Sequence, residues 1–187
     1  KKKVKENDLV NLNYPPGIRR EYAKYKIKAE NYLKKNFNKD KLIIARLFSF
    51  NGQFLLKNKH YAVGNFLKDA KSSDKIKVKS SSPDNIYRSY LDSSDLVQFL
   101  MHLIVGKNKT KNNIFNVGSD RAISIKQLAE KIAKISHKKI YYNNKIKSNL
   151  FDYYVPNINK IKKNYPLKKI ITIEKSLLKN LNNINKN

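Results

Sequence analysis

The stretch that decides the fold reads Arg20-Glu-Tyr22-Ala-Lys-Tyr25-Lys26-Ile-Lys-Ala29-Glu30, and a strand-like apolar run follows it. Its spacing is helical, and it places Tyr22 and Lys26 four residues apart, so both side chains face the same way on a helix. A phenol beside an ammonium group ionises more readily, because the positive charge favours the phenolate. Such a pair can remove a proton from an alcohol. The stretch therefore predicts a helix that carries a candidate general base.

The spacing Tyr-x-x-x-Lys is common in this chain, so its surroundings have to decide which occurrence matters. Chance predicts roughly two such pairs for this composition. Three occur, at Tyr22/Lys26, Tyr141/Lys145 and Tyr165/Lys169. The third precedes a proline, which disfavours helix, and the second precedes a turn-like Asn-Asn pair. Only the first lies in a long helical pattern. The alternative is that Tyr22 is a half-buried packing residue and that Lys26 pairs with Glu30.

Length and composition indicate a folded chain. Its 187 residues are enough for one domain or for part of a larger one, and 40% of them are hydrophobic. No apolar run is long enough to span a membrane. The chain has no cysteine, which excludes disulfides and thiolate metal sites, and its histidines (His60, His102 and His137) show no ligand spacing. We therefore expect no metal centre and no membrane partner.

The formal net charge of +27 would ordinarily point to a nucleic-acid partner. The positive residues are nearly all Lys, however. Recognition of bases and phosphates favours Arg, because its planar guanidinium group can form two parallel hydrogen bonds. Lys, Asn and Ile are also abundant from end to end, as AT-rich codon usage would produce. We expect no specific nucleic-acid partner and only weak attraction to polyanions. A basic, non-catalytic nucleic-acid-binding protein is the alternative.

Strands alternate with helices along the chain, which indicates an α/β protein. The expected helices cover 20–36, 62–70, 92–105, 125–136, 157–164 and 172–182, and the expected strands cover 41–50, 75–79, 86–91, 113–117 and 138–142, with a loop from there through Pro156. The apolar run at 41–50 is typical of a parallel strand covered on both faces. We expect Ser124 to cap the helix that follows it, and Asp92 and Asp95 to act as helix-capping acids rather than as a catalytic pair.

The five glycines, at 17, 52, 64, 106 and 118, cannot form a glycine-rich dinucleotide fingerprint. The only methionine is Met101, and the chain opens with three lysines. We therefore expect residues upstream of this chain. The phosphate-binding half of any nucleotide-cofactor site would lie among them.

Five motifs follow one another between about residues 19 and 180. They are Tyr22-x-x-x-Lys26-x-x-Ala29-Glu30, Arg46-x-Phe48-x-x-x-Gly52, Gly64-Asn65-Phe66, Arg88-x-Tyr90-x-x-x-x-Asp95, and Phe115-Asn116-Val117-Gly118-Ser119 with Ile123-Ser124-Ile125. In this order they resemble the extended short-chain dehydrogenase/reductases, specifically the NAD-dependent nucleotide-sugar epimerase/dehydratase family. Five ordered motifs are far more specific than any one of them.

The resemblance implies a fold and a division into domains. The fold is α/β, the C-terminal part of a Rossmann-type doubly wound sheet plus a small α/β substrate-binding domain. Residues 1–52 would end the NAD-binding domain with the catalytic helix and the following strand. Residues 53–187 would be mostly the substrate-binding domain, with a strand and helix near 86–106 that could return to the Rossmann domain.

The resemblance also implies a reaction. Tyr22, as phenolate, would take a proton from a sugar hydroxyl while hydride leaves the same carbon for the nicotinamide of NAD or NADP. Lys26 would make the tyrosine more acidic and bind the ribose hydroxyls of the nicotinamide, so both residues are catalytic and cofactor-binding. Arg88 would bind the diphosphate of a nucleotide-diphosphate sugar through two N–H donors of its planar guanidinium group, a geometry that Lys cannot reproduce. Asn65 would donate to the same phosphates.

Blander roles are open for several of these residues. Arg88 could form an ion pair with Asp84 or Asp92, and Asn65 could simply occupy a turn. Arg46, Gly52 and Gly118 are interpreted as structural. A degenerate family member retained for assembly or binding is a further alternative to an enzyme.

The chain departs from the family pattern at three places. Tyr25 replaces the usual Ser or Thr before the catalytic lysine, Ser49 replaces an Asn, and Ser80-Ser-Ser-Pro83 replaces the glycines before the Arg88 strand. The cofactor fingerprint and the catalytic Ser or Thr would lie upstream, so we expect this chain alone to be inactive. For the full-length protein the resemblance implies a cytoplasmic homodimer that pairs through the catalytic helix.

Overall fold

The computed structural model of the chain describes residues 2–9, 18–54, 61–106, 113–143, 151–165 and 170–184. The helices are α1 (Ile18–Asn36), α2 (Ala62–Ser72), α3 (Ser93–Val105), α4 (Ile125–Ser136), α5 (Asn159–Asn164) and α6 (Ile173–Ile184). The strands are β1 (Ile44–Leu47), β2 (Phe50–Asn51), β3 (Lys75–Val78), β4 (Ile86–Arg88), β5 (Leu91–Asp92), β6 (Ile114–Val117), β7 (Ile123–Ser124), β8 (Lys139–Tyr142) and β9 (Asp152–Tyr154).

The strands pair mostly in parallel, across long stretches of sequence. β1 pairs with β6, β2 with β5, β3 with β8 and β4 with β9, all parallel, whereas β4 and β7 are antiparallel. Parallel pairs need crossover connections, and the helices between them supply these. The predicted α/β fold class is confirmed.

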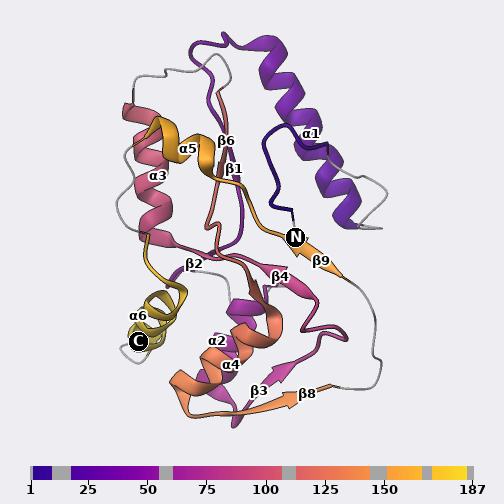
Figure 1. Ribbon diagram of the computed structural model, residues 1–187, viewed down its shortest axis with the longest axis vertical. Coiled ribbons are helices and arrows are strands. Elements are labelled where there is room, and N and C mark those ends of the chain that lie inside the picture. The colour runs from indigo at the N-terminus through magenta and orange to yellow at the C-terminus, as the bar shows by residue number, and fades with distance from the viewer. Residues whose placement is uncertain are drawn as a thin grey trace.

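One part of the molecule is built around β1 and β6. Figure 1 shows α1 on one side of this strand pair and α3 with α5 on the other. The apolar side chains that meet there come from β5, α3, β6 and the region of α5, and they are Leu91, Leu96, Phe99, Leu103, Phe115, Val117, Ile158, Ile161 and Tyr165.

The other part packs helices α2, α4 and α6 against β3 and its neighbours (Figure 1). Its buried apolar residues are Val63, Phe66, Leu67, Ala70, Ile76, Val78, Tyr90, Ile123, Ile125, Leu128, Ala129, Ile132, Ala133 and Leu177. That the core falls into two clusters accords with a two-domain chain, but the predicted boundary at residue 52 stays a prediction.

Helix α4 forms as its sequence predicts. The Ser124 hydroxyl accepts a hydrogen bond from the Gln127 N–H, and the Gln127 side chain accepts one from the Ser124 N–H. This reciprocal capping box satisfies two amide groups that the first helical turn leaves unpaired. His137 ends the helix in the left-handed conformation, with φ 54°.

Two expectations about strands are wrong in part. The apolar run at 41–50 forms two short strands, β1 and β2, and β1 is only half-buried, because within the described residues it has one strand neighbour. The region expected to be loop up to Pro156 contains a strand, β9. Three residues give too short a pattern to predict, and β9 exists because it pairs with β4, about 65 positions earlier in the sequence.

The amino-terminal segment is tied into both β6 and the residues after β9. Val4 donates its N–H to Val155 O at 2.9 Å and accepts one from Asn157 N at 2.7 Å. The Asn116 side chain also donates to Val4 O, at 2.9 Å. The segment therefore links the end of β6 to the chain beyond β9.

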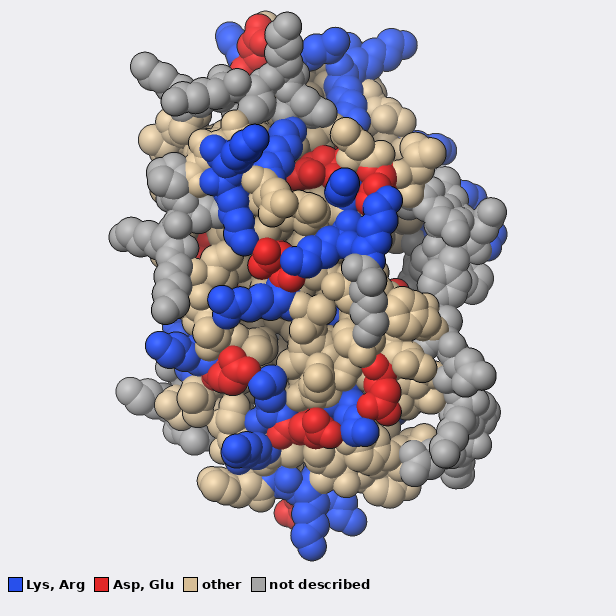
Figure 2. All heavy atoms as spheres, in the orientation of Figure 1, with Lys and Arg blue, Asp and Glu red and all other residues tan. Residues whose placement is uncertain are grey.

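Basic side chains cover much of the surface. On the face in Figure 2, Lys and Arg extend from one end of the molecule to the other, with Asp and Glu between them. On this face the positive charge is spread rather than gathered into one stripe. Among the described residues, none of the helices has the length and apolar character to cross a membrane.

Candidate active site

Tyr22 and Lys26 lie on the same side of α1, as predicted. The Lys26 Nζ is 5.4 Å from the centroid of the Tyr22 ring, within the range of a cation–π contact. Tyr22 is 64% exposed, so it is not the half-buried packing residue of the alternative interpretation. Lys26 does not pair with Glu30 either, since that carboxylate is held by Arg46 and Lys34.

Arg46 fixes the position of α1 relative to β1. Its Nε and Nη2 donate to the two carboxylate oxygens of Glu30, at 3.0 and 2.6 Å, in the bidentate geometry that favours Arg. Its Nη1 donates to Glu6 O at 2.7 Å. The Arg46 hydrogen bonds lower the pKa of Glu30. Arg46 is structural, as predicted, and it orients the helix that carries Tyr22.

Arg88 lies at the end of β4 and is held in an ion pair. Its Nη2 donates to Asp152 Oδ2 on β9 at 2.6 Å, and its Nη1 donates to Tyr87 O at 2.7 Å. The structure thus shows an ion pair of Arg88, but the partners considered from the sequence are wrong. Asp84 is bound to Lys126 instead, and Asp92 caps α3 through Ser94 N.

Tyr154 joins the α1 side of this region to the Arg88 side. Its ring stacks on Phe48 with centroids 4.5 Å apart, and the Arg88 Cζ lies 6.0 Å from its centroid. Partial burial raises the pKa of Tyr154, and the charges of Arg88, Tyr22 and Arg46 act on it too. Of the two predicted site residues, Arg88 therefore lies beside the Tyr154 ring, while Tyr22 is linked to Tyr154 only through the effect of its charge.

We call this group the Tyr22–Arg88 cluster, consisting of Tyr22, Lys26, Phe48, Arg88, Asp152 and Tyr154. Four elements or their ends contribute to it: α1, the end of β1, β4 and β9. Sequence reasoning missed Asp152 and Tyr154 because it placed them in a loop. An Asp followed by two tyrosines is a weak strand signal in itself, although aromatic residues favour strands.

Asn65 lies within α2, inside the helix expected over 62–70 and not in a turn; it is exposed, its N–H donates to Tyr61 O, and its contact with phosphates stays a prediction. Asp92 and Asp95 act as helix-end acids, as predicted: Asp92 is the N-cap of α3, and Asp95, in its first turn, accepts from Ile171 N at 2.8 Å.

The cluster offers an exposed phenol with an adjacent ammonium group, and a guanidinium anchored by a carboxylate. The first can exchange a proton with a bound alcohol, and the second can bind a phosphate. Tyr22 and Lys26 lie together on one exposed helix side, where both can form hydrogen bonds to a bound hydroxyl group. Among the described residues, no group of three His, Asp or Glu side chains could hold a metal ion.

No family model and no curated protein matches the chain. Solved structures do. A UDP-glucuronic acid 4-epimerase from Bacillus cereus, solved with UDP-4-deoxy-4-fluoro-glucuronic acid and NAD, is 15% identical with a TM-score of 0.79, over 100% of this chain and 57% of that one. A dTDP-glucose 4,6-dehydratase from Bacillus anthracis, in complex with NAD, is 16% identical with a TM-score of 0.72, over 99% of this chain and 58% of that one.

A third structure is TunA, an NAD-dependent NDP-hexosamine 5,6-dehydratase, with 15% identity and a TM-score of 0.74 over 92% of this chain and 56% of that one. The chain thus spans a little over half the length of the structures it matches. The likeness shows that the chain has the fold of the carboxy-terminal portion of NAD-dependent nucleotide-sugar epimerases and dehydratases. The fold predicted from the five motifs is confirmed.

Proposed function

We propose that the chain is the catalytic-helix and substrate-binding part of an NAD(P)-dependent nucleotide-sugar epimerase or dehydratase. The observation that carries this is the pairing of Tyr22 and Lys26 on one exposed side of α1. The fold matches enzymes whose names include nucleotide sugars and NAD. The chain has no glycine-rich fingerprint, so activity requires a dinucleotide-binding part that these residues do not supply.

Tyr22 acts as the general base. Its hydroxyl is exposed on α1, where a sugar hydroxyl can approach it, and the Lys26 ammonium lies over its ring. Lys26 would also hold the ribose of the cofactor through hydrogen bonds. A bound nicotinamide dinucleotide would supply the hydride acceptor. Arg46 and Glu30 keep α1 in position during this step.

Arg88 binds the diphosphate of the substrate. Two of its N–H donors are used in the hydrogen bonds to Asp152 and Tyr87, which fix the guanidinium plane. A guanidinium has five N–H donors, so others are left for phosphate oxygens. Nucleotide-diphosphate sugars are the substrate class, with Asn65 on α2 as a second phosphate donor. We also propose that the full-length enzyme is a homodimer that pairs through α1.

The first test is turnover of a UDP-sugar by the full-length protein carrying Tyr22→Phe. Loss of a positioned general base lowers rates by about 10²–10⁴-fold. Tyr25→Phe is the matched control, because Tyr25 lies on the same helix, is 67% exposed and also has a lysine, Lys28, over its ring. Equal turnover of the two variants would contradict the role of Tyr22. Unchanged affinity of the Tyr22→Phe variant for the UDP-sugar would show that only chemistry was lost.

The second test is binding of UDP to the 187-residue chain, followed by NMR titration. Arg88→Lys keeps the charge but loses the planar fork, so we expect roughly tenfold weaker binding. Lys139→Gln is the control, since Lys139 lies on β8, outside the Tyr22–Arg88 cluster. Equal weakening by both variants would indicate attraction to general positive charge. Tight nucleic-acid binding that persists at physiological salt would favour the non-catalytic alternative.

A further inference from the structure

A second concave site lies apart from the Tyr22–Arg88 cluster. It is a pocket of about 480 Å³, bounded by the outer side of α4, the segment 119–123 and the chain that leads into α6. No residue of the Tyr22–Arg88 cluster lines it. Its volume falls within the range of small-molecule pockets in proteins.

A buried phenol lines this pocket. Tyr90 is only 8% exposed, and its hydroxyl makes no hydrogen bond within the described part of the chain. Burial raises the pKa of Tyr90, so the hydroxyl keeps its proton and remains a donor at neutral pH. The hydroxyl is therefore available to a ligand.

The charged side chains of the pocket leave cations in excess. Lys131 is neutralised by Glu174 at 2.6 Å, while Arg121 and Lys134 have no carboxylate partner among the described residues. One further acid, Glu130, also lines the pocket, and its charge acts on Lys126 and Tyr142. The pocket thus presents two unpaired cations, one carboxylate and a neutral donor, which leaves one positive charge in excess.

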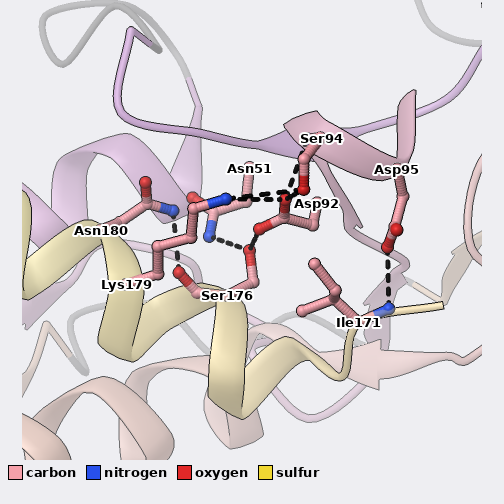
Figure 3. Close-up of polar contacts among 8 residues, drawn as sticks. All are labelled: Asn51, Asp92, Ser94, Asp95, Ile171, Ser176, Lys179 and Asn180. Atoms are coloured by element: carbon pink, nitrogen blue, oxygen red, sulfur yellow. Dashed lines mark hydrogen bonds and ion pairs between the residues drawn. The ribbon is translucent and has the colours of Figure 1, made fainter. Parts of the chain in front are cut away.

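Part of the pocket wall is apolar. Ile123, Ile171 and Ile173 line it, beside the polar Ser119 and Gln127. Figure 3 shows how the Ile171 wall is anchored: Ile171 N donates to Asp95 at 2.8 Å, and further along α6 the Ser176 hydroxyl donates to Asp92 at 2.5 Å. Asn51 in turn donates to Ser176 at 3.0 Å. A wall fixed at both places keeps the pocket open rather than letting α6 collapse into it.

We propose that this pocket binds a small organic anion, with its carboxylate or phosphate on Arg121, Lys134 and the Tyr90 hydroxyl and its apolar body against the isoleucines. The proposal does not depend on the proposed function, because it uses other residues. Tyr90 lies two positions after Arg88, whose charge acts against the effect of burial on the pKa of Tyr90. A ligand in this pocket therefore contacts the same chain segment that presents Arg88.

The test titrates the 187-residue chain with benzoate, benzyl alcohol and inorganic phosphate, and follows backbone amide shifts by NMR. Benzoate combines the charge with an apolar ring, so we expect it to cause saturable shifts at Ala122, Gln127 and Ile171. The alcohol lacks the charge and phosphate lacks the ring, so each should bind at least several-fold more weakly. Tyr90→Phe and Arg121→Gln should each weaken benzoate binding by roughly tenfold, the effect of one charge-assisted hydrogen bond.

Matched controls come from β8, which does not line the pocket. Tyr141→Phe and Lys139→Gln remove the same kinds of group and should leave benzoate binding unchanged. Shifts spread over surface lysines, or equal weakening by Lys139→Gln, would overturn the proposal, as would the absence of saturable binding. Arg88→Lys should not affect benzoate binding, so failure of this site is distinguishable from failure of the proposed active site.

Discussion

Helices α1 and α4 have similar sequence patterns but opposite environments. In α4 the apolar side is fully buried, with Leu128, Ala129 and Ile132 inaccessible to solvent. In α1 the aromatic side is open, with Tyr22 and Tyr32 each 64% exposed. Helix α4 is held by packing, whereas α1 is held largely by the ion pair of Arg46 with Glu30. Helical periodicity thus predicts an apolar side, but it does not say whether this chain itself covers that side.

The largest effect on stability should follow from Leu128→Ala in α4. Removing a fully buried leucine side chain costs about 2–5 kcal/mol of the free energy of unfolding. Tyr25→Ala in α1 removes a larger side chain, but an exposed one, and should cost about 0.5 kcal/mol. Urea denaturation of the 187-residue chain measures both. Similar losses for the two variants would show that the aromatic side of α1 is covered in solution, and the contrast between the helices would fail.

Replacing the anchor of α1 should have a smaller and local effect. Glu30→Gln removes the charge that Arg46 and Lys34 share, and we expect a loss of about 1–2 kcal/mol. Amide hydrogen exchange should quicken throughout α1 and stay unchanged in α4. As a control, Glu21→Gln alters a fully exposed carboxylate of the same helix that pairs only with Lys24 among the described residues. If exchange in α1 responds equally to both changes, the Arg46 contact does not hold the helix.

The same contact should respond to acid. The folded-state pKa of Glu30 is lowered from its usual value of 4.5, chiefly by the Arg46 hydrogen bonds. Its contribution to stability is therefore fully present above that value and is lost as the pH falls through the lowered pKa. Helix α4 is capped by uncharged Ser124 and Gln127, which do not titrate in this range. As the pH is lowered, amide hydrogen exchange should quicken in α1 before it quickens in α4. Simultaneous quickening in the two helices would contradict the role of the ion pair between Glu30 and Arg46.

The predictable parts of the molecule are those with local signals. The helix around Tyr22, the cap at Ser124 and the helix-end role of Asp92 depend on residues only a few positions apart, and all three were predicted. β9 depends instead on pairing with β4, far back in the sequence, and this pairing brings Asp152 to Arg88. Motif spacing could not reveal that contact, because a three-residue strand has no period of its own to recognise.

The N-cap of α4 should contribute about 1 kcal/mol to the free energy of unfolding. Ser124→Ala leaves the Gln127 N–H without its acceptor, and the loss of an N-cap side chain typically costs this much. Ser136→Ala, at the other end of the helix, removes only a hydroxyl that donates to Ile132 O, and should cost less. The midpoints of urea denaturation compare the two variants. A larger effect at Ser136 would mean that the helix is specified by its packing and its C-terminal end rather than by its cap.

The smallest effect on stability should come from the residue with the largest expected effect on turnover. Tyr22→Phe keeps the aromatic ring over which Lys26 lies and removes only an exposed hydroxyl, so the free energy of unfolding should change by less than about 0.5 kcal/mol. Thermal and urea unfolding of the same protein used for kinetics would check this. A loss well above 1 kcal/mol would show that the hydroxyl supports the fold, and slower turnover would then no longer identify a general base. An unchanged stability with slow turnover separates the function of α1 from the packing that stabilises α4.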